Sequence, residues 1–266
     1  MKILTLIKYS LDVAEIKVNP DSKELQMSGV PQKIGNIDKN VVEAAVRLRE
    51  AIGGEVVLQG LCLGPQSARE SFKDVLAMGL DEIFLVDDPF AGAADGRVAV
   101  SILEAAIRKL GAFDLILCGF ASDDGYTYQT PPRLAERLGL PLVSYARRLS
   151  ASNGQLQADR DLEDNLQTVA VSMPALASIA EEAFPPRRTT LMDALKAKKK
   201  PVTIWQVQAD LGLSPAELEQ ASRFAAFSQI GVVVHRKQQI FKGKPAAELA
   251  DQLIDALLKE TVVKGA

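Results

Sequence analysis

Short apolar runs alternate with amphipathic stretches through the first half of the chain. The runs are short enough for buried strands and cover residues 3–7, 55–63, 82–86 and 115–118. The stretches between them carry apolar residues at helical spacing and predict helices over residues 39–52, 66–78 and 96–110. Asp38 stands where it can cap the first of these helices. This alternation predicts an α/β fold with a mostly parallel sheet flanked by helices.

The pattern changes after Pro141. Strands joined by short turns are predicted at residues 142–149, 154–158 and 168–171, followed by one more apolar strand at 174–179. Parallel alternation therefore gives way to an antiparallel meander. One turn of this meander is acidic, with Asp159, Asp161, Glu163 and Asp164. Because these residues alternate with Arg160 and Leu162, we expect a solvated hairpin and no metal site.

The last part of the chain departs from the βα alternation. We predict a short cationic helix at 189–200, a helix at 211–226, a short strand at 230–235 and a terminal helix at 245–260. The terminal helix carries one apolar stripe, formed by Leu249, Leu253, Ile254, Leu257 and Leu258. We therefore expect an α/β domain over residues 1–204 and a C-terminal extension over residues 205–266 that packs on a partner subunit.

One stretch, residues 113–140, has the features of a ligand crevice. An apolar strand ends at Gly119, a polar loop follows, and Pro131 and Pro132 open a helix. In open α/β sheets, ligands bind beyond the carboxyl ends of the strands, and a helix start offers unpaired N–H groups that suit a phosphate. Such loops also occur without a ligand, so an ordinary strand–helix connection stays as the alternative.

Composition and charge narrow the function classes. The net charge is −3, from 31 Lys and Arg against 34 Asp and Glu, which argues against general binding of nucleic acids. Cys62 and Cys118 each end an apolar run, so we expect buried thiols and a reducing compartment. No apolar stretch approaches the length of a membrane span or of a signal peptide. We expect a cytoplasmic protein that is not inserted in a membrane.

Four segments follow the pattern of a known family. They are KILTLIKYSLD at 2–12, DKNVVEAAVRLRE at 38–50, GPQSARESFKDVLAMGLDEIFLV at 64–86 and MPALASIAEEAFPPRRTTLMDALKAKKKPV at 173–202. The last segment is the most distinctive, because it combines a proline–arginine turn, a leucine-centred loop and a lysine-rich end. Taken in order, these segments resemble the β subunit of electron transfer flavoproteins, and the resemblance covers nearly the whole chain.

The resemblance implies an electron carrier. Such β subunits pair with an α subunit that holds most of an FAD. The pair accepts electrons from flavin dehydrogenases, often acyl-CoA dehydrogenases, and passes them to a quinone-linked oxidoreductase. The β subunit itself usually carries AMP, whereas a second FAD takes that place in electron-bifurcating members. The N-terminal half also fits an adenine-nucleotide-hydrolase-like fold.

The resemblance also implies a nucleotide pocket. Its expected residues are Leu6, Asp38, Asn40, Leu63, Gly64, Gly119, Asp124, Gly125, Thr127, Tyr128, Gln129 and Thr130. Tyr126 and Tyr128 stand where bifurcating members have small or acidic residues, and they leave less room for a second isoalloxazine. Pro131 removes an N–H that could donate to a phosphate. We expect a non-bifurcating carrier with one FAD per heterodimer, and with AMP in this pocket or a pocket left partly empty.

A second expected site is a docking loop over residues 184–201. The resemblance places an apolar anchor at Leu191, and the nearby cations are Lys196, Lys198, Lys199 and Lys200. An apolar anchor ringed by polar contacts is typical of a binding hot spot. The same lysines also suit a solvated helix, because positive charge near a helix C-terminus is favourable. The resemblance favours docking on a partner dehydrogenase.

Two function classes stay open. One is an electron-carrier subunit without a substrate-turnover site of its own. The sequence does not assemble a nucleophile, a base and oxyanion donors, and its single histidine is His235. The other class is a stand-alone enzyme or sensor that binds an adenine nucleotide. Because a carrier subunit needs a partner, co-purification with a yellow flavoprotein chain of similar size discriminates the two.

Overall fold

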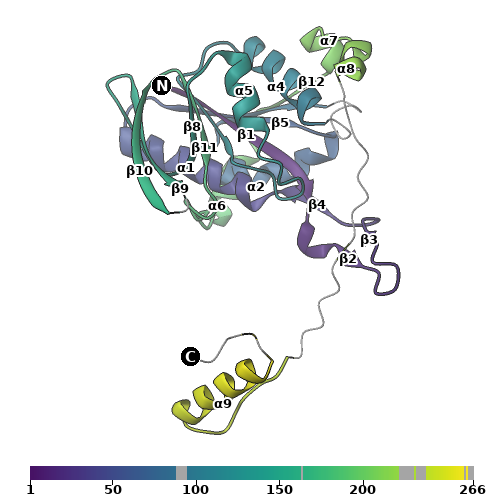
Figure 1. The fold of residues 1–266 in the computed structure, drawn as a ribbon. Coiled ribbons are helices and arrows are strands. Elements are labelled where there is room, and N and C mark those ends of the chain that lie inside the picture. The colour runs from purple at the N-terminus through teal and green to yellow at the C-terminus, as the bar shows by residue number, and fades with distance from the viewer. Residues whose placement is uncertain (88–94, 163, 222–230, 232–237, 261, 263–266) are drawn as a thin grey trace. The chain divides into compact units, whose positions relative to one another are not determined.

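The computed structural model describes residues 1–87, 95–162, 164–221, 231, 238–260 and 262. The chain forms two compact units, one made of residues 1–17 and 26–228 and the other of residues 18–25 and 229–266. The first unit is built on one large sheet with helices on both faces (Figure 1). Apart from Gly231, the strand predicted at 230–235, with His235, lies outside the described residues.

Within the described residues, the large sheet has ten strands in the order β10-β9-β8-β11-β7-β1-β5-β6-β12, with β4 paired to β1. Their bounds are β1 Lys2–Leu11, β4 Gln32–Ile34, β5 Val57–Leu63, β6 Glu82–Val86, β7 Leu115–Gly119, β8 Leu142–Ser152, β9 Gln155–Leu162, β10 Asn165–Ser172, β11 Ala175–Ile179 and β12 Val202–Trp205. Neighbours from β8 to β12 in this order run parallel, whereas β8, β9 and β10 form an antiparallel meander. The predicted mostly parallel α/β sheet with its meander is confirmed.

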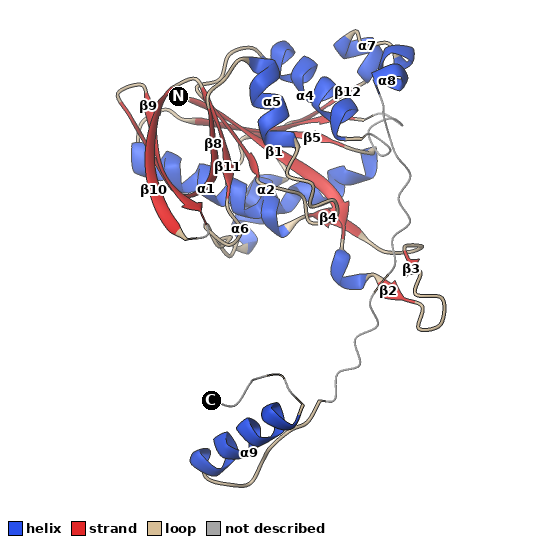
Figure 2. Cartoon of the chain, viewed as in Figure 1, coloured by secondary structure: helices blue, strands red, loops and turns tan. Residues whose placement is uncertain are grey.

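Alternate residues of the central strand face two separate helix layers, because successive side chains of a strand point to opposite faces. Ile3 and Ile7 of β1 join the core beneath α1 and α2, whereas Leu4 and Leu6 join the core beneath α4 and α5. The helices are α1 Asn36–Ile52, α2 Phe72–Met78, α4 Gly96–Leu110, α5 Thr130–Leu138, α6 Leu191–Ala197, α7 Val207–Leu211, α8 Pro215–Ala221 and α9 Ala246–Lys259. Figure 2 shows the sheet between its two helix layers.

The shorter elements complete the description. Two 3-10 helices, η1 (Val13–Glu15) and η2 (Gln66–Ser71), and a two-stranded sheet of β2 (Lys17–Val18) and β3 (Leu25–Gln26) lie in the connections. The helix predicted at 66–78 is therefore a 3-10 turn, η2, that continues into α2. Both cysteines are free and buried, as expected.

The first helix begins at Asn36, and Asp38 does not cap it. The carboxylate of Asp38 is buried in the first turn and accepts a hydrogen bond from the Lys8 N–H at 3.1 Å. The cap comes from a distant loop instead, because the Asp123 carboxylate accepts from the N–H groups of Asn36 at 2.7 Å and Ile37 at 3.4 Å. The predicted cap was wrong because a donor–acceptor pair separated by 87 residues leaves no local signal.

The segment after α6 extends the sheet. β12 pairs in parallel with β6, and Trp205 packs on Phe84 with ring centroids 5.0 Å apart. In the described part of the predicted helix at 211–226, α7 ends where Gly212 takes a left-handed conformation with φ 70°, and α8 follows. The first compact unit therefore continues past the boundary that we predicted at residue 205.

The second unit contains the predicted terminal helix, α9. Within this unit its apolar residues are accessible, with Leu253 47%, Ile254 51% and Leu258 39% exposed. Packing of α9 on a partner subunit stays a prediction. Across the described ranges, none of the helices combines the length and apolarity needed to cross a lipid bilayer.

The acidic turn of the meander is a hairpin between β9 and β10, as predicted. Asp159 accepts a hydrogen bond from the Thr168 hydroxyl at 2.7 Å, and Asp161 pairs with Arg147 at 2.8 Å. Glu163 lies outside the described residues. Among the residues that are described, no group of three or more His, Cys, Asp or Glu side chains is arranged to hold a metal ion.

Candidate functional site

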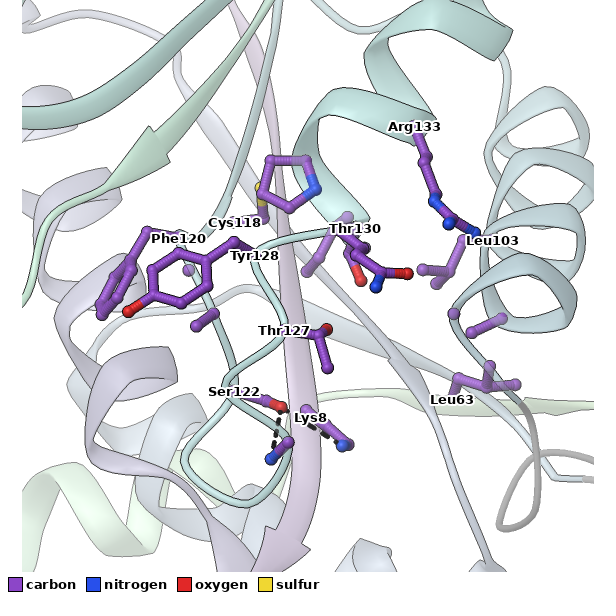
Figure 3. Close-up of a pocket in the computed structure, with 18 of the residues that line it drawn as sticks. Lys8, Leu63, Leu103, Cys118, Phe120, Ser122, Thr127, Tyr128, Thr130 and Arg133 are labelled. Atoms are coloured by element: carbon purple, nitrogen blue, oxygen red, sulfur yellow. Dashed lines mark hydrogen bonds between the residues drawn. The ribbon is translucent and has the colours of Figure 1, made fainter. Parts of the chain in front are cut away.

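A cavity of about 640 Å³ opens at the carboxyl ends of β1, β5 and β7. β1 stands between the other two strands, so the cavity lies at the point where open α/β sheets bind ligands. Its walls come from these strand ends, from the first turns of α1, α4 and α5, and from the loop between β7 and α5 (Figure 3). The volume falls within the range of small-ligand sites, about 300 to 1,000 Å³.

Nine of the twelve predicted pocket residues line this cavity: Leu6, Asp38, Leu63, Gly119, Gly125, Thr127, Tyr128, Gln129 and Thr130. The other three make contacts elsewhere. The buried side chain of Asn40 accepts from the Phe184 N–H at 2.8 Å, and Gly64 donates its N–H to the Val86 carbonyl at 3.1 Å. Asp124 faces Lys8. Binding of a nucleotide by the nine lining residues stays a prediction.

The cavity also contains charged and polar residues that sequence reasoning missed. They are Lys8, Asp95, Arg97 and Arg133; Ser122, which also lines the cavity, belongs to the polar loop of the predicted crevice. One signal was available in the sequence Asp95-Gly96-Arg97, which opens α4 after the strand at 82–86. In a parallel sheet, the helix that follows a strand starts at the carboxyl edge, so these residues belong to the edge that holds the cavity.

The starts of α4 and α5 meet at one side of the cavity. A Cβ atom on Gly96 would lie 3.1 Å from the Gln129 side-chain oxygen, so glycine permits this close approach. The Asp95 carboxylate caps α4 by accepting from the N–H groups of Arg97 at 2.8 Å and Val98 at 3.0 Å. The first turn of α5 holds two prolines, which have no N–H to offer. Both helix starts therefore offer few backbone donors to a ligand.

Asp38 is a buried carboxyl group in the cavity wall. Its Oδ1 accepts from the Lys8 N–H, whereas its Oδ2 has no hydrogen-bond partner among the described residues. Burial raises the pKa of Asp38 to about 8, and the negative charges of Asp123 and Asp124 add to this effect against the opposing influence of Lys8. Asp38 is therefore mostly protonated at neutral pH and can donate a hydrogen bond.

Lys8 is held by a carboxylate outside the cavity wall. Its ammonium group pairs with Asp124 at 2.6 Å and donates to the Ser122 hydroxyl at 3.4 Å. Burial alone would raise the pKa of Asp124, but the hydrogen bond and charge of Lys8 hold that pKa below its usual value. Figure 3 shows Lys8 and Ser122 facing each other below Thr127. Lys8 is thus paired with a carboxylate of its own chain.

Aromatic residues pack around the same loop. Tyr126 and Tyr128 have positive φ angles of 46° and 59°, and their rings meet edge to face with centroids 5.3 Å apart. Both rings also pack on Phe120, with centroids 5.5 Å away in each case. In Figure 3 the rings of Phe120 and Tyr128 lie together, away from Arg133 and Leu103. Tyr126 is not among the lining residues, so Tyr128 is the tyrosine that contributes to the wall.

Comparison with known proteins identifies the family. The model of the electron transfer flavoprotein domain matches residues 24–210. The chain belongs to the electron transfer flavoprotein family. The electron transfer flavoprotein subunit beta of Thermoanaerobacterium thermosaccharolyticum is 32% identical over 263 residues, which cover 98% of this chain and 95% of the relative. The caffeyl-CoA reductase-Etf complex subunit CarD of Acetobacterium woodii is 30% identical, over 99% of this chain and all of the relative. Protein FixA of Azorhizobium caulinodans is 33% identical over 78% of this chain and 76% of its own length.

These matches confirm the resemblance to electron transfer flavoprotein β subunits that the sequence motifs indicated. The relatives align along nearly the full chain and include several electron transfer flavoprotein β subunits. The chain is thus a member of the β-subunit family, whose function is electron transfer and whose complexes are flavoproteins. Its α/β fold is consistent with the matched domain.

In this flavoprotein chain, the predicted docking loop contains a well-capped helix, α6. Thr190 and Asp193 form a reciprocal capping box, which fixes the helix start. Three apolar side chains next to this cap are exposed, with Leu191 at 78%, Met192 at 61% and Leu195 at 46%. A rigid element that presents apolar side chains to solvent suits a binding surface. Docking itself stays a prediction.

The four predicted docking lysines fall into two groups. Lys196, Lys198 and Lys199 are exposed. Lys200 is partly buried, and its ammonium group donates to the carbonyl oxygens of Leu76 at 2.9 Å and Leu80 at 2.5 Å. Burial lowers the pKa of Lys200. The structure therefore ties Lys200 to the end of α2, whereas the other three lysines remain accessible.

Arg187 anchors the docking loop to α1. Its guanidinium group pairs with Glu43 at 2.8 Å and with Glu50 at 2.6 Å, and Arg47 also pairs with Glu43 at 2.7 Å. Burial opposes ionisation of Glu43, but the hydrogen bonds from Arg187 and Arg47 hold its pKa below the usual value. Sequence reasoning did not assign the pairs of Arg187, because Arg187 lies far along the chain from Glu43 and Glu50.

Proposed function

We propose that this chain is the β subunit of a heterodimeric electron transfer flavoprotein. Its partner is an α subunit that holds most of one FAD near the interface. The heterodimer accepts electrons from flavin dehydrogenases such as acyl-CoA dehydrogenases and passes them to a quinone-linked oxidoreductase. One observation carries this proposal: α6 presents Leu191 at 78% exposure from a capped helix, as an anchor for a dehydrogenase requires.

The name of one relative supports a partner enzyme that acts on CoA esters. CarD is called a subunit of a caffeyl-CoA reductase-Etf complex, so a similar chain works beside an enzyme of CoA esters. Here the chain itself acts as a carrier and not as an enzyme. In such a carrier the flavin supplies the redox chemistry, and the protein contributes binding, orientation and electrostatics.

The cavity of this chain holds AMP in our proposal, or stays partly empty. The cavity volume of about 640 Å³ suits a nucleotide. Tyr126 and Tyr128 stand where bifurcating members have small or acidic residues, and Tyr128 lines the cavity, which favours one FAD per heterodimer and a non-bifurcating carrier. Nine lining residues match the pocket that the family resemblance implied.

Acid extraction of the purified heterodimer, followed by nucleotide analysis, tests this proposal. We expect one FAD with one AMP, or one FAD alone if the pocket is empty. Close to two FAD per heterodimer would instead establish the bifurcating alternative. Purification of a folded, colourless chain without a flavoprotein partner would favour a stand-alone adenine-nucleotide-binding protein and would contradict the carrier assignment.

A further inference from the structure

Two arginines in the cavity wall have no partner in the described part of the chain. The cations that line the cavity are Lys8, Arg97 and Arg133. Lys8 is already paired with Asp124 at 2.6 Å. Neither the Arg97 nor the Arg133 guanidinium group makes a hydrogen bond or ion pair with the described residues. As far as the described residues show, these two guanidinium groups are therefore free to meet a ligand.

The Arg133 side chain is partly withdrawn from solvent. Figure 3 shows its side chain running from α5 beside Thr130 toward Leu103 of α4, and the residue is partly buried. A guanidinium group that loses water without gaining an acceptor loses hydrogen bonds, so an anion in the cavity would restore them. The planar fork of arginine matches the oxygens of a phosphate and can bind them in pairs.

The backbone N–H groups at the starts of α4 and α5 are largely unavailable to an anion, so side chains must bind it. Asp95 already accepts from the Arg97 and Val98 N–H groups at the start of α4. At the start of α5, Pro131 and Pro132 provide no N–H. Because the helix starts meet at Gly96 and Gln129, the arginine-bearing first turns of α4 and α5 lie at the same side of the cavity.

A second feature of the cavity points independently to a ligand. Asp38 is only 4% exposed and lines the cavity, and its Oδ2 has no partner among the described residues. A buried polar atom without a partner is rare in folded proteins, and a polar group bound in the cavity is one way to satisfy it. A protonated Asp38 also adds no negative charge that would repel an anion.

We propose that Arg97 and Arg133 bind the phosphate monoester of the nucleotide in this cavity, in place of the backbone amides that the prolines have removed. This assignment rests on the proposed function, which places a nucleotide there. A phosphate monoester carries close to two negative charges at neutral pH, so two guanidinium groups balance it. Nucleotides with a terminal phosphate are the ligand class that this arrangement selects.

The test compares AMP with adenosine on the nucleotide-free heterodimer by calorimetry. The variants are Arg97→Ala and Arg133→Ala. Their matched controls are Arg108→Ala on α4 and Arg137→Ala on α5, which pair with Glu104 outside the cavity. We expect each cavity variant to weaken AMP roughly 10- to 100-fold, while adenosine changes less than about twofold. The control variants should bind both ligands as the wild type does.

Equal losses for AMP and adenosine would overturn the assignment, because the arginines would then support the fold and not the phosphate. Unchanged AMP binding in both cavity variants would also overturn the arginine assignment. The proposal that AMP binds in the cavity would then still stand. If the wild type does not bind AMP but takes up FAD, the AMP proposal fails. The monoester assignment then fails too, because FAD carries a pyrophosphate diester and no terminal phosphate.

Discussion

At the scale of single residues, Asp38 in the cavity wall makes the stability of the fold depend on pH. Its carboxyl group is surrounded by Lys8 on β1 and by Asp123 and Asp124 in the loop after β7, and the thiols of Cys62 and Cys118 lie within its electrostatic reach. Because burial disfavours the charged form, the folded state holds a proton that the unfolded chain releases at much lower pH. Ionisation of this one residue thus costs folding free energy.

We predict that the free energy of unfolding falls as pH rises through the window set by Asp38. Its pKa is about 8 in the folded chain against an ordinary value of 3.8, so the loss runs from about pH 4 to about pH 8. The slope reaches at most about 1.4 kcal/mol per pH unit. Asp38→Asn keeps the acceptor for the Lys8 N–H and removes the titration. Urea unfolding of both proteins at several pH values measures the difference, and parallel pH profiles would contradict the prediction.

The second residue-scale prediction concerns Leu191. Because this side chain is 78% exposed, Leu191→Ala should leave the fold and the flavin content unchanged. Electron transfer from the partner dehydrogenase should weaken roughly tenfold, mainly through faster dissociation, as expected for an apolar anchor. Leu166→Ala on β10 is the control, since Leu166 is 67% exposed on a different element. Stopped-flow kinetics that show equal transfer in both variants would remove the docking assignment.

At the scale of elements, α6 is held at both ends by charged contacts of different kinds. Arg187 ties the preceding loop to Glu43 and Glu50 of α1, and Lys200 ties the following residues to carbonyl oxygens at the end of α2. The Glu43 side chain is only 2% exposed, so its pairing with Arg187 avoids an uncompensated buried charge. These anchors fix the surface that presents Leu191.

The lysines at the end of α6 should affect different properties: some the rate of association with the dehydrogenase, and one the stability of the fold. Lys198→Gln with Lys199→Gln should lower the association rate with the dehydrogenase several-fold at low salt, and the difference should shrink as salt screens the charges. Lys200→Gln should instead lower the free energy of unfolding by about 1 to 2 kcal/mol, because two carbonyl oxygens lose a charged donor. Association rates across a salt series and urea unfolding measure the two effects. If Lys200→Gln left the free energy of unfolding unchanged but slowed association, the prediction that Lys200 stabilises the fold would be wrong.

At the scale of the whole molecule, the chain consists of a sheet unit and a smaller unit that carries α9. The sheet unit has a core on each face of its sheet, whereas α9 has no buried residue within its own unit. An amphipathic helix with its apolar stripe exposed gains stability only when another surface covers it. We expect the α subunit to provide that surface.

Substitutions on this stripe should therefore affect assembly and not folding. Leu253→Asp and Ile254→Asp place charges on residues that are 47% and 51% exposed. Each should weaken association with the α subunit by at least tenfold and leave the thermal midpoint of the isolated chain within about two degrees. Asp251→Asn, a charge change on the same helix at an exposed position, is the control. Unchanged heterodimer formation would contradict partner packing.

The sequence by itself determined the fold class and most of its elements. β6 and α4 have the predicted bounds, and β1, β5 and β7 differ only at their ends. Strand and helix periodicities are local properties, so they can be recognised in a short window. The family motifs were also local, which is why the resemblance and nine of the lining residues could be named from the sequence.

Only the tertiary structure decided which charges remain free and which atoms are buried. Asp38 was expected both as a helix cap and as a pocket residue; Asp38 does line the cavity, but Asp123 caps the helix and the Asp38 carboxyl group is buried. Lys200 was grouped with the docking lysines, but α2 supplies its acceptors. Arg97 and Arg133 reach the same cavity from two helices whose starts meet only in the folded chain. Burial and pairing depend on distant segments, so no local pattern of residues encodes them.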